Sequence, residues 1–485
     1  MTTEELLFSL SWVQPELILA GFAMLGTLIG AVFGVRASAL LTGLGFVALV
    51  SAGVIALYYQ PGAPQAVFAG AMVVDGFASV SKAIIAFAAA ATLLLGADHF
   101  TRLQDRRFEF PLITVTAVLG MFVMVSANDL ITLYVGVELQ SLAAYVLAAW
   151  RRDDARSSEA GLKYFVLGAL SSGLLLFGCS YIYGFAGSVQ FDAIAAASAT
   201  GEPGIGLIFG LVMVLAGLAF KMSAAPFHMW TPDVYEGAPT PITALFAAAP
   251  KVAAVMLMAR MLYEPFAGMQ AEWQQVVAFL AGASMVVGSF AGLVQTSLKR
   301  LMAYSSIANM GFVLMALAAG APDGAEAALI YVAVYVPATI GVFAIMLALR
   351  ARGEAIGQVD DLAGLGQRHV AYGAVLTILV FSLAGIPPLA GFWGKYNALL
   401  AALGVNLTLL AIIGAICAVV SLGYYLRILS VVWFSPAAAS EVRPVGLTAS
   451  TVAVIGAALA FVVLNVAMPA LEDRAEAAVR TSFLQ

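Results

Sequence analysis

Long apolar runs, separated by short polar segments, fill almost the whole chain. A bilayer-spanning helix takes about 20 mostly apolar residues, and most of the runs reach about that length. The runs predict an all-α polytopic membrane protein with about 14 transmembrane helices. The predicted helices cover residues 14–34, 39–58, 74–95, 111–127, 129–150, 160–183, 205–235, 243–263, 274–294, 301–320, 325–349, 371–402, 406–434 and 447–470.

Two of these runs, 205–235 and 371–402, are too long for one straight crossing, and each contains proline beside small residues. Proline removes a backbone donor and clashes with the preceding turn, so we expect helix breaks at Pro226 and at Pro387 and Pro388. The two breaks lie 161 residues apart. A shift by the same number of residues also carries the starts of other predicted helices close to later helix starts. Paired interrupted helices in two halves indicate a transport site at the interface of a repeat.

The offset divides the chain into two five-helix repeats, inverted relative to each other and each with one broken helix. The expected parts are three N-terminal helices in 1–110, a first repeat in 111–263, a second repeat in 264–434, and a last helix with a tail in 435–485.

The composition agrees with this reading, since 62% of the residues are hydrophobic and 10% are charged. Soluble domains are about 45–50% apolar and about 25% charged, so a soluble protein and a separate catalytic domain are both excluded. The net charge of −5 is spread over short loops. A net charge this small and this dispersed predicts no nucleic-acid partner. The lipid bilayer is the expected partner of the apolar runs.

The chain has only two cysteines, Cys179 and Cys417, and three histidines. This set cannot hold an iron–sulfur cluster or two bis-histidine haems. We therefore expect no redox cofactor and no metal in this chain.

The distribution of Lys and Arg predicts the orientation, because cytoplasmic loops carry the excess. Thirteen loop cations fall on one side and three on the other. Both termini are then expected in the periplasm, and the N-terminus does not resemble a cleavable signal. The first set is Arg36, Arg102, Arg106, Arg107, Arg151, Arg152, Arg156, Lys299, Arg300, Arg350, Arg352, Arg368 and Arg443, and the second is Arg260, Arg474 and Arg480.

Four ionisable residues fall in the middle layer of the predicted membrane: Glu138, Lys221, Lys251 and Lys395. Each costs at least about 2.5–3.5 kcal/mol there, so each needs a partner, water or a role. Burial disfavours the charged form of lysine and a nearby carboxylate favours it, so such groups can switch protons. The alternative for Glu138 and Lys221 is a static ion pair that holds two helices together.

Weaker candidates lie outside this set of four residues. Lys163 follows Glu159 by four residues and is either paired with it or part of a relay. His228 is either a proton carrier or a group that satisfies the backbone freed at Pro226. Lys299 is a third possible relay, and Lys82 is expected to anchor at the headgroups.

Five segments resemble the antiporter-like membrane subunits of respiratory complex I, the proton-pumping NADH:quinone oxidoreductase. They are KMSAAPFHMWTPDVYEGAPTPITALFAAAPKVAAV (221–255), NDLITLYVGVELQSLAAYVL (128–147), SSEAGLKYFVLGALSSG (157–173), QTSLKRLMAYSSIANMGF (295–312) and AGIPPLAGFWGKYNAL (384–399).

This resemblance implies that Glu138, Lys221, Lys251 and Lys395 form a hydrated proton axis. Lys395 lies beside the break at Pro387 and Pro388, eleven residues before Asn406 at the outer end of its predicted span, and this position favours it as the terminal proton-loading site. It also implies a non-redox subunit of a translocase in the bacterial inner membrane. NADH, FMN, iron–sulfur clusters and quinone would then belong to other complex I subunits, which are the expected partners.

Within that family, Lys395 and the short segment after the last predicted helix favour one of three antiporter-like members, since another has glutamate at this position and the largest has a long extension. Subunits of multi-subunit Na⁺/H⁺ antiporters and of membrane-bound hydrogenases share much of the pattern and are the alternative. A carrier of organic solutes would be expected to show polar substrate groups at the broken helices, and a pure scaffold would not need the buried lysines.

Overall fold

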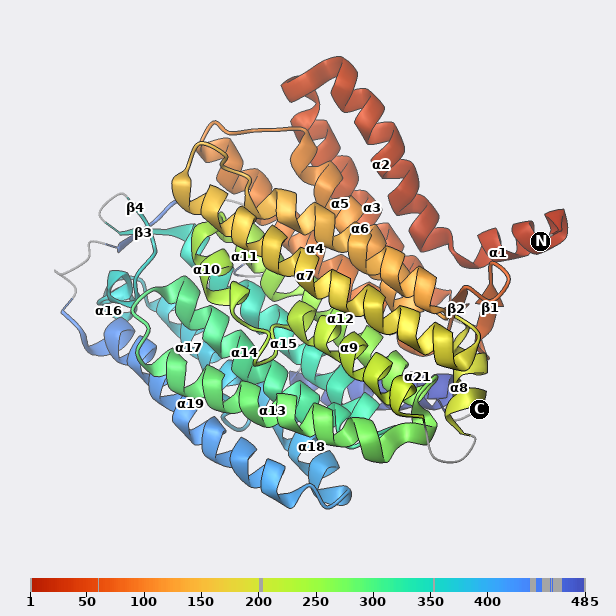
Figure 1. The fold of residues 1–485 in the computed structure, drawn as a ribbon. Helices are drawn as coiled ribbons and strands as arrows, with labels where there is room; N and C mark the ends of the chain where they lie inside the picture. The colour runs from red at the N-terminus through yellow and green to blue at the C-terminus, as the bar shows by residue number, and fades with distance from the viewer. Residues whose placement is uncertain are drawn as a thin grey trace.

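The computed structural model describes residues 2–59, 61–199, 204–351, 354–436, 442–446, 454, 456 and 465–483. It is a bundle of long helices that lie side by side (Figure 1). Within the described residues, eleven helical segments are long and apolar enough to cross a membrane. The sequence-based prediction of an all-α polytopic membrane protein is therefore confirmed.

The helices of the N-terminal part and of the first predicted repeat are α1 (Thr3–Trp12), α2 (Gln14–Phe33), η1 (Gly34–Ala37), α3 (Ser38–Tyr58), α4 (Gly76–Arg102), α5 (Glu109–Ser126), α6 (Leu130–Ala148), α7 (Ala155–Ala186), α8 (Phe191–Ser198), α9 (Ile205–Met222), α10 (Trp230–Gly237), α11 (Thr240–Ala247) and α12 (Ala249–Tyr263).

The later helices are η2 (Ala267–Met269), α13 (Gln270–Leu293), α14 (Leu298–Leu317), α15 (Asp323–Ala348), η3 (Val359–Leu362), α16 (Leu365–Arg368), α17 (Val370–Ala384), α18 (Ala390–Gly404), α19 (Thr408–Phe434) and α21 (Met468–Phe483). The strands are β1 (Gln65–Val67), β2 (Met72–Val74), β3 (Leu349–Ala351), β4 (Glu354–Ala355) and β5 (Val442–Pro444).

Thirteen of the fourteen predicted crossings coincide with described helices. The last, 447–470, lies largely outside the described residues. The structure shows one further interruption that was not predicted. Helix α11 ends at Ala247 and α12 begins at Ala249, one residue before Pro250. A proline fits the first turn of a helix because its missing N–H would be unpaired there.

The core lies around α12, α14 and α15. Every residue of α12 is buried, whereas α7 and α19 expose large apolar side chains such as Leu170 and Leu409 along one face. A helix that is apolar all round belongs in the interior, and a helix at the edge of the bundle can offer its apolar face to lipid. Lys251 therefore sits on a helix that is enclosed on all sides.

Two helix pairs approach each other through glycine. In α5 and α6, a Cβ on Gly120 would lie 2.5 Å from the backbone nitrogen of Gln140. In α13 and α14, a Cβ on Gly288 would lie 2.4 Å from the backbone nitrogen of Ala308. Small residues permit such close contact between membrane helices. The first helix pair of each predicted repeat thus packs in the same way.

The two ends of the bundle differ. Both chain ends lie at one end of the bundle with β1, β2 and α8, while β3 and β4 lie at the other end (Figure 1). At the first end α21 packs against α4, where Ser482 accepts a hydrogen bond from the backbone N–H of Phe77. The N- and C-terminal segments therefore share one side of the bundle.

Candidate functional site

Both predicted helix breaks are present, and they have the same construction. Helix α9 ends at Ser223 and α17 ends at Gly385, and each of these residues has a left-handed backbone with φ of 65° and 84°. The proline segments at Pro226 and at Pro387 and Pro388 follow directly, before α10 and α18 begin. A left-handed residue is a common way to end a helix, and its last carbonyl groups then need other partners.

Lys221 lies in the last turn of α9 and is 5% exposed. Its ammonium donates to the hydroxyl of Ser141 at 2.7 Å, of Tyr145 at 3.3 Å and of Ser172 at 3.4 Å. These hydroxyls come from α6 and α7, so the charge is surrounded by neutral oxygen atoms from the neighbouring helices.

Glu138 lies on α6, three residues before Ser141 and seven before Tyr145, which places all three on one face of the helix. Within the described residues it forms no ion pair with Lys221, and its buried Oε1 atom has no hydrogen-bond partner. The structure therefore brings Glu138 to the edge of the hydroxyl cluster, while hydroxyl groups rather than the carboxylate contact Lys221.

Lys251 is 1% exposed and contacts the end of α9. Its ammonium donates to the carbonyl oxygen of Met222 at 3.0 Å and to the hydroxyl of Ser223 at 2.8 Å. Lys251 itself belongs to the first turn of α12, where the helix dipole disfavours a cation, but the end of α9 favours one.

Lys395 repeats this arrangement in the other half of the molecule. It lies on α18 and donates to the carbonyl oxygens of Leu383 at 3.0 Å and Ala384 at 2.9 Å, at the end of α17. The side chain is 7% exposed. The first half of each broken helix thus presents the negative end of its dipole to a buried lysine, which comes from α12 at the first break and from the second half of the same broken helix, α18, at the second break.

The candidate relay residue Lys163 belongs to a charged cluster around Asp233 of α10. Its ammonium lies 2.7 Å from Glu159 and 2.7 Å from Asp233, and Arg300 lies 2.7 Å from the second oxygen of Asp233. The predicted pair with Glu159 is present. The sequence-based search missed Asp233, which joins α7 to α14 and is hard to recognise because its partners are about 70 residues away in either direction.

Lys299 and His228 lie in different surroundings. The ammonium of Lys299 donates to the carbonyl oxygen of Ala238 at 2.7 Å, just past the end of α10. His228 is half-buried in the segment between α9 and α10, and its buried Nδ1 atom has no hydrogen-bond partner in the described part of the chain.

Two cations differ from the expectation. Lys82 does not reach the headgroup region, because it is 2% exposed and its ammonium lies 2.5 Å from Glu16 of α2. Arg260 is not a loop residue, because it lies in α12, is fully buried and pairs with Asp75 at 2.8 Å. Carboxylates distant in sequence supply these partners, and hydropathy alone does not indicate them.

Arg260 also pairs with Glu264, at 2.5 Å, just beyond the end of α12. Burial raises the pKa of the Glu264 carboxyl to about 7, against the opposing effect of the Arg260 guanidinium. This cluster lies close to the C-terminal helix, since Phe483 of α21 packs against Arg260.

Among the described residues, no group of three or more His, Cys, Asp or Glu side chains could hold a metal ion. Cys179 and Cys417 are buried and free.

A helical bundle with two broken helices at matching positions is typical of membrane transporters built from internal repeats. A family model described as NADH:quinone oxidoreductase/Mrp antiporter, TM, matches residues 127–421. This chain belongs to that family, which confirms the resemblance seen in the sequence.

Individual relatives agree over the whole length. The chain is 49% identical to NADH-quinone oxidoreductase subunit N 1 of Rhizobium meliloti (strain 1021) over 100% of both chains. It is 51% identical to NADH-quinone oxidoreductase subunit N of Jannaschia sp. (strain CCS1), over 88% of this chain and 89% of that protein.

Solved structures show the same fold. A chain of respiratory complex I from Thermus thermophilus with bound aureothin matches with a TM-score of 0.82 and 33% identity, over 96% of this chain and 100% of that chain. A chain of the Mrp complex from Dietzia sp. DQ12-45-1b matches with a TM-score of 0.85 and 20% identity, over 99% and 98% of the two chains. The second likeness concerns the fold alone.

Proposed function

We propose that this chain is a subunit of the N type in a proton-translocating NADH:quinone oxidoreductase, and that Glu138, Lys221, Lys251 and Lys395 carry its protons. The full-length relatives with this name support the assignment. The chain then works as a non-redox part of the translocase. NADH, FMN, iron–sulfur clusters and quinone belong to the other subunits of the complex, which are its partners.

The observation that carries the proposal is the neutral surroundings of the three buried lysines. Lys221 donates to hydroxyl oxygens, Lys251 donates to one carbonyl and one hydroxyl oxygen, and Lys395 donates to carbonyl oxygens. A carboxylate in direct contact would hold the proton firmly, whereas neutral oxygen atoms compensate only part of the cost of burying an ammonium ion. Each lysine can therefore exist in its charged and its neutral form.

Glu138 acts as the switch for Lys221. Its carboxylate lies one helical turn from Ser141, which directly contacts the ammonium. A movement of the carboxylate toward the hydroxyl cluster favours the charged lysine, and a movement away favours release of the proton. Redox chemistry in the partner subunits drives this movement through charge and hydration along the membrane.

Lys251 is poised between two opposing helix ends. The end of α9 stabilises its charge, and the start of its own helix α12 destabilises it. A small displacement of either helix end changes the balance, so Lys251 suits the transfer of protons from Lys221 toward the second half. Lys395 is the terminal loading site in this scheme.

Lys163, Lys299 and His228 are assigned to proton entry and relay. Lys163 contacts Asp233 of α10, and Lys299 contacts Ala238 just past the end of α10. We place this end in the cytoplasm because it carries most of the loop cations, with both termini in the periplasm of a bacterial inner membrane.

The domain limits also belong to this proposal: residues 111–263 and 264–434 are two inverted five-helix repeats, preceded by 1–110 and followed by 435–485. The matching glycine contacts at Gly120 and Gly288 support the pairing of α5 with α13. The left-handed ends at Ser223 and Gly385 support the pairing of α9 with α17.

Replacement of Lys221 tests the proposal in the assembled complex. Lys221→Ala should lower NADH-driven proton uptake into inside-out vesicles while the complex still assembles. Lys221→Arg should also lower it, because a guanidinium keeps its proton. Rates are divided by an electron-transfer assay that bypasses the membrane subunits.

The matched control is the double variant Glu16→Gln/Lys82→Met. It removes a buried lysine outside the proposed axis together with its partner carboxylate, so no unpaired charge remains. Its pumping should stay at the wild-type level. If Lys221→Arg pumps normally, or if Lys221→Ala fails only because the complex does not assemble, Lys221 has a structural role and does not carry protons.

The alternative is a subunit of a multi-subunit Na⁺/H⁺ antiporter or of a membrane-bound hydrogenase. It is supported only by the fold that this chain shares with the Mrp complex chain. Identification of the chains that co-purify with this one separates the two assignments.

A further inference from the structure

Trp230 joins the two halves of the first broken helix. It is the first residue of α10, and its indole N–H donates to the carbonyl oxygen of Phe220 at 3.0 Å. Phe220 belongs to the last turn of α9 and directly precedes Lys221. The last carbonyl groups of a helix need donors from elsewhere, and Trp230 supplies one from the other side of the break. The position of α10 therefore bears directly on the backbone that carries Lys221.

The Trp230 ring also reaches the surroundings of Lys221 by a second route. It is 2% exposed and stacks on Tyr164 of α7, with the ring centres 4.3 Å apart and the planes at 8°. The Tyr164 ring packs edge-on against Tyr145 at 4.8 Å, and the Tyr145 hydroxyl accepts a hydrogen bond from the Lys221 ammonium at 3.3 Å. Protein interiors are close-packed, so a displacement of one ring displaces the next.

The charged cluster around Asp233 lies on the same short helix. Asp233 follows Trp230 by three positions, so the two side chains share a face of α10. Lys163 directly precedes Tyr164 in α7, and its ammonium lies 2.7 Å from Asp233. Helices α7 and α10 thus meet through an ion pair and a ring stack side by side. The Lys163, Asp233 and Arg300 side chains are 41%, 35% and 29% exposed, so protons from solution can reach the cluster.

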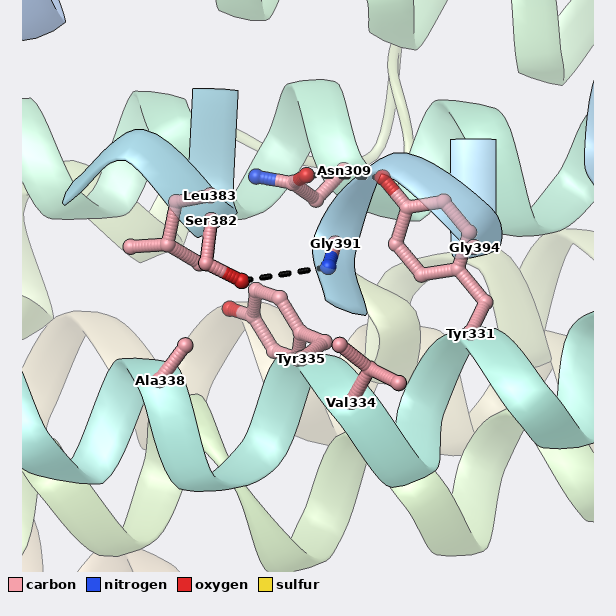
Figure 2. Close-up of a pocket in the computed structure, with 9 residues that line it drawn as sticks. All are labelled: Asn309, Tyr331, Val334, Tyr335, Ala338, Ser382, Leu383, Gly391 and Gly394. Carbon is pink, nitrogen blue, oxygen red and sulfur yellow. Dashed lines mark hydrogen bonds between the residues drawn. The ribbon is translucent and has the colours of Figure 1, made fainter. Parts of the chain in front are cut away.

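The second break is joined in another way. The Ser382 hydroxyl of α17 accepts a hydrogen bond from the backbone N–H of Gly391 of α18 at 3.2 Å (Figure 2). The two backbones are so close that Gly391 has no room for a Cβ. Lys395 itself crosses this break, from α18 to the carbonyl oxygen of Leu383. The lysine of the second break is therefore attached to the second helix half directly, whereas at the first break a large aromatic ring connects that half to the lysine.

We propose that Trp230 is a positioning residue that links the charged cluster around Asp233 to Lys221. This inference rests on the proposed function and adds a control of its first lysine. A proton that binds the Asp233 carboxylate removes its negative charge and weakens its contact with Lys163. Helix α10 is then less firmly held, Trp230 shifts against both of its neighbours, and the groups around the Lys221 ammonium move with them. No proton passes through Trp230 itself.

Trp230→Phe tests the link in the assembled complex. Phenylalanine keeps a ring that can stack but lacks the N–H, so the Phe220 carbonyl loses its donor. We expect NADH-driven proton uptake, divided by electron transfer, to fall by about tenfold, the factor that corresponds to one hydrogen bond. The matched control is Trp273→Phe, because Trp273 is also 2% exposed and donates to the carbonyl oxygen of Phe266 at 2.9 Å, outside the broken helix. The control should pump at the wild-type rate.

Thermal dissociation of the complex separates positioning from stability. Trp230→Phe and Trp273→Phe each lose one buried hydrogen bond to a carbonyl group, so they should lower the midpoint by similar amounts. Only Trp230→Phe should also lower proton uptake. Equal proton uptake by the two variants overturns the link.

Asp233→Asn tests the other end of the link. Both cations of the cluster keep a second carboxylate in this variant, since Lys163 also contacts Glu159 and Arg300 also contacts Glu236. The fold should therefore be retained, while the weakened hold on α10 lowers proton uptake several-fold. Proton uptake at the wild-type rate would show that the cluster does not act on Lys221, and the link would be wrong.

The double variant Trp230→Phe/Asp233→Asn tests whether the two residues belong to one link. It should pump no worse than the poorer of the two single variants, because both changes interrupt the same connection. Losses that multiply in the double variant would show that Trp230 and Asp233 act independently, which overturns the proposal.

Lys221→Ala separates failure of this link from failure of the proposed function. If Lys221→Ala loses proton uptake while Trp230→Phe keeps it, Lys221 carries protons and the link is wrong. If Lys221→Ala pumps normally, the proposed axis itself is wrong, and the link is wrong with it.

Discussion

The ammonium group of Lys251 lies 2.8 Å from the hydroxyl oxygen of Ser223, the residue at which helix α9 ends. A helix that ends inside a membrane leaves carbonyl groups without intrahelical partners, and the bilayer offers no water to satisfy them. Lys251 supplies a donor to that end, and the unpaired carbonyl groups offset part of the cost of its charge. The break in the helix and the buried cation therefore depend on each other.

Ser223→Gly should weaken this arrangement without disturbing the backbone. Ser223 has a φ of 65°, which glycine adopts without strain, so the helix end is retained while the hydroxyl is lost. We expect normal assembly and proton uptake lowered several-fold. Assembly is followed on native gels and proton uptake in inside-out vesicles; uptake at the wild-type rate would show that the Met222 carbonyl alone suffices.

Lys395 should tolerate glutamate better than arginine. A buried carboxyl can take up a proton and donate it to the Leu383 or Ala384 carbonyl, whereas arginine remains charged. The expected order of proton uptake is wild type, then Lys395→Glu, then Lys395→Ala and Lys395→Arg. An arginine variant equal to the wild type beside an inactive glutamate variant would assign Lys395 a fixed-charge role.

Arg260→Met should destabilise the protein by about 3–5 kcal/mol, because Asp75 is left as a buried unpaired carboxylate. The double variant Asp75→Asn/Arg260→Met should recover much of this loss, since the fully buried carboxylate is removed, the remaining partner Glu264 is 22% exposed, and asparagine still caps α4. The midpoint of thermal dissociation of the purified complex measures both effects. Equal midpoints for the single and double variants would contradict the charge explanation.

Glu264 should make stability depend on pH. Burial raises the pKa of its carboxyl from 4.5 to about 7 in the folded state, so between these values the folded chain keeps a proton that the unfolded chain has lost. The contribution to stability therefore falls as the pH rises from 4.5 to about 7 and is constant above that. Glu264→Gln should be stabilised relative to the wild type increasingly over this window. Parallel curves of thermal midpoint against pH would exclude the effect.

Thiol labelling of intact cells tests the orientation of the chain. Thr3 at the start of α1 and Asp153 between α6 and α7 are both exposed, and both native cysteines are buried. With the termini in the periplasm, Thr3→Cys should react with an impermeant reagent and Asp153→Cys should not. The wild type is the unlabelled control, and the reverse pattern would invert the topology.

Most of the fold could be predicted from the sequence, because a long apolar run in a membrane forms a helix and a proline within it indicates a break. The depth of Lys221, Lys251 and Lys395 within their runs also predicted that they are buried, and the structure confirms this. The break at Ala248 was missed, because the helix resumes at once and its apolar pattern is continuous.

The partners of the buried charges could not be read in the same way. Ser141 and Tyr145 share a helical face with Glu138, so the 3.6-residue period could have indicated them. Glu16 and Asp75 lie far in sequence from Lys82 and Arg260, and their pairing depends on how the helices pack. Backbone carbonyl partners have no sequence signal, because every residue carries one.

The partners of the buried cations share one further property, which concerns the order of synthesis. Lys82 pairs with Glu16, and Arg260 pairs with Asp75, in each case a residue nearer the N-terminus. The second partner of Arg260, Glu264, follows just beyond the end of the same helix. The three lysines of the proposed axis likewise donate only to earlier residues, namely Ser141, Tyr145, Ser172, Met222, Ser223, Leu383 and Ala384. A charged residue in an isolated helix makes insertion unfavourable by about 2.5–3.5 kcal/mol. On a ribosome that builds the chain from its N-terminus, each of these cations emerges after a group that stabilises it, so none depends on a later helix.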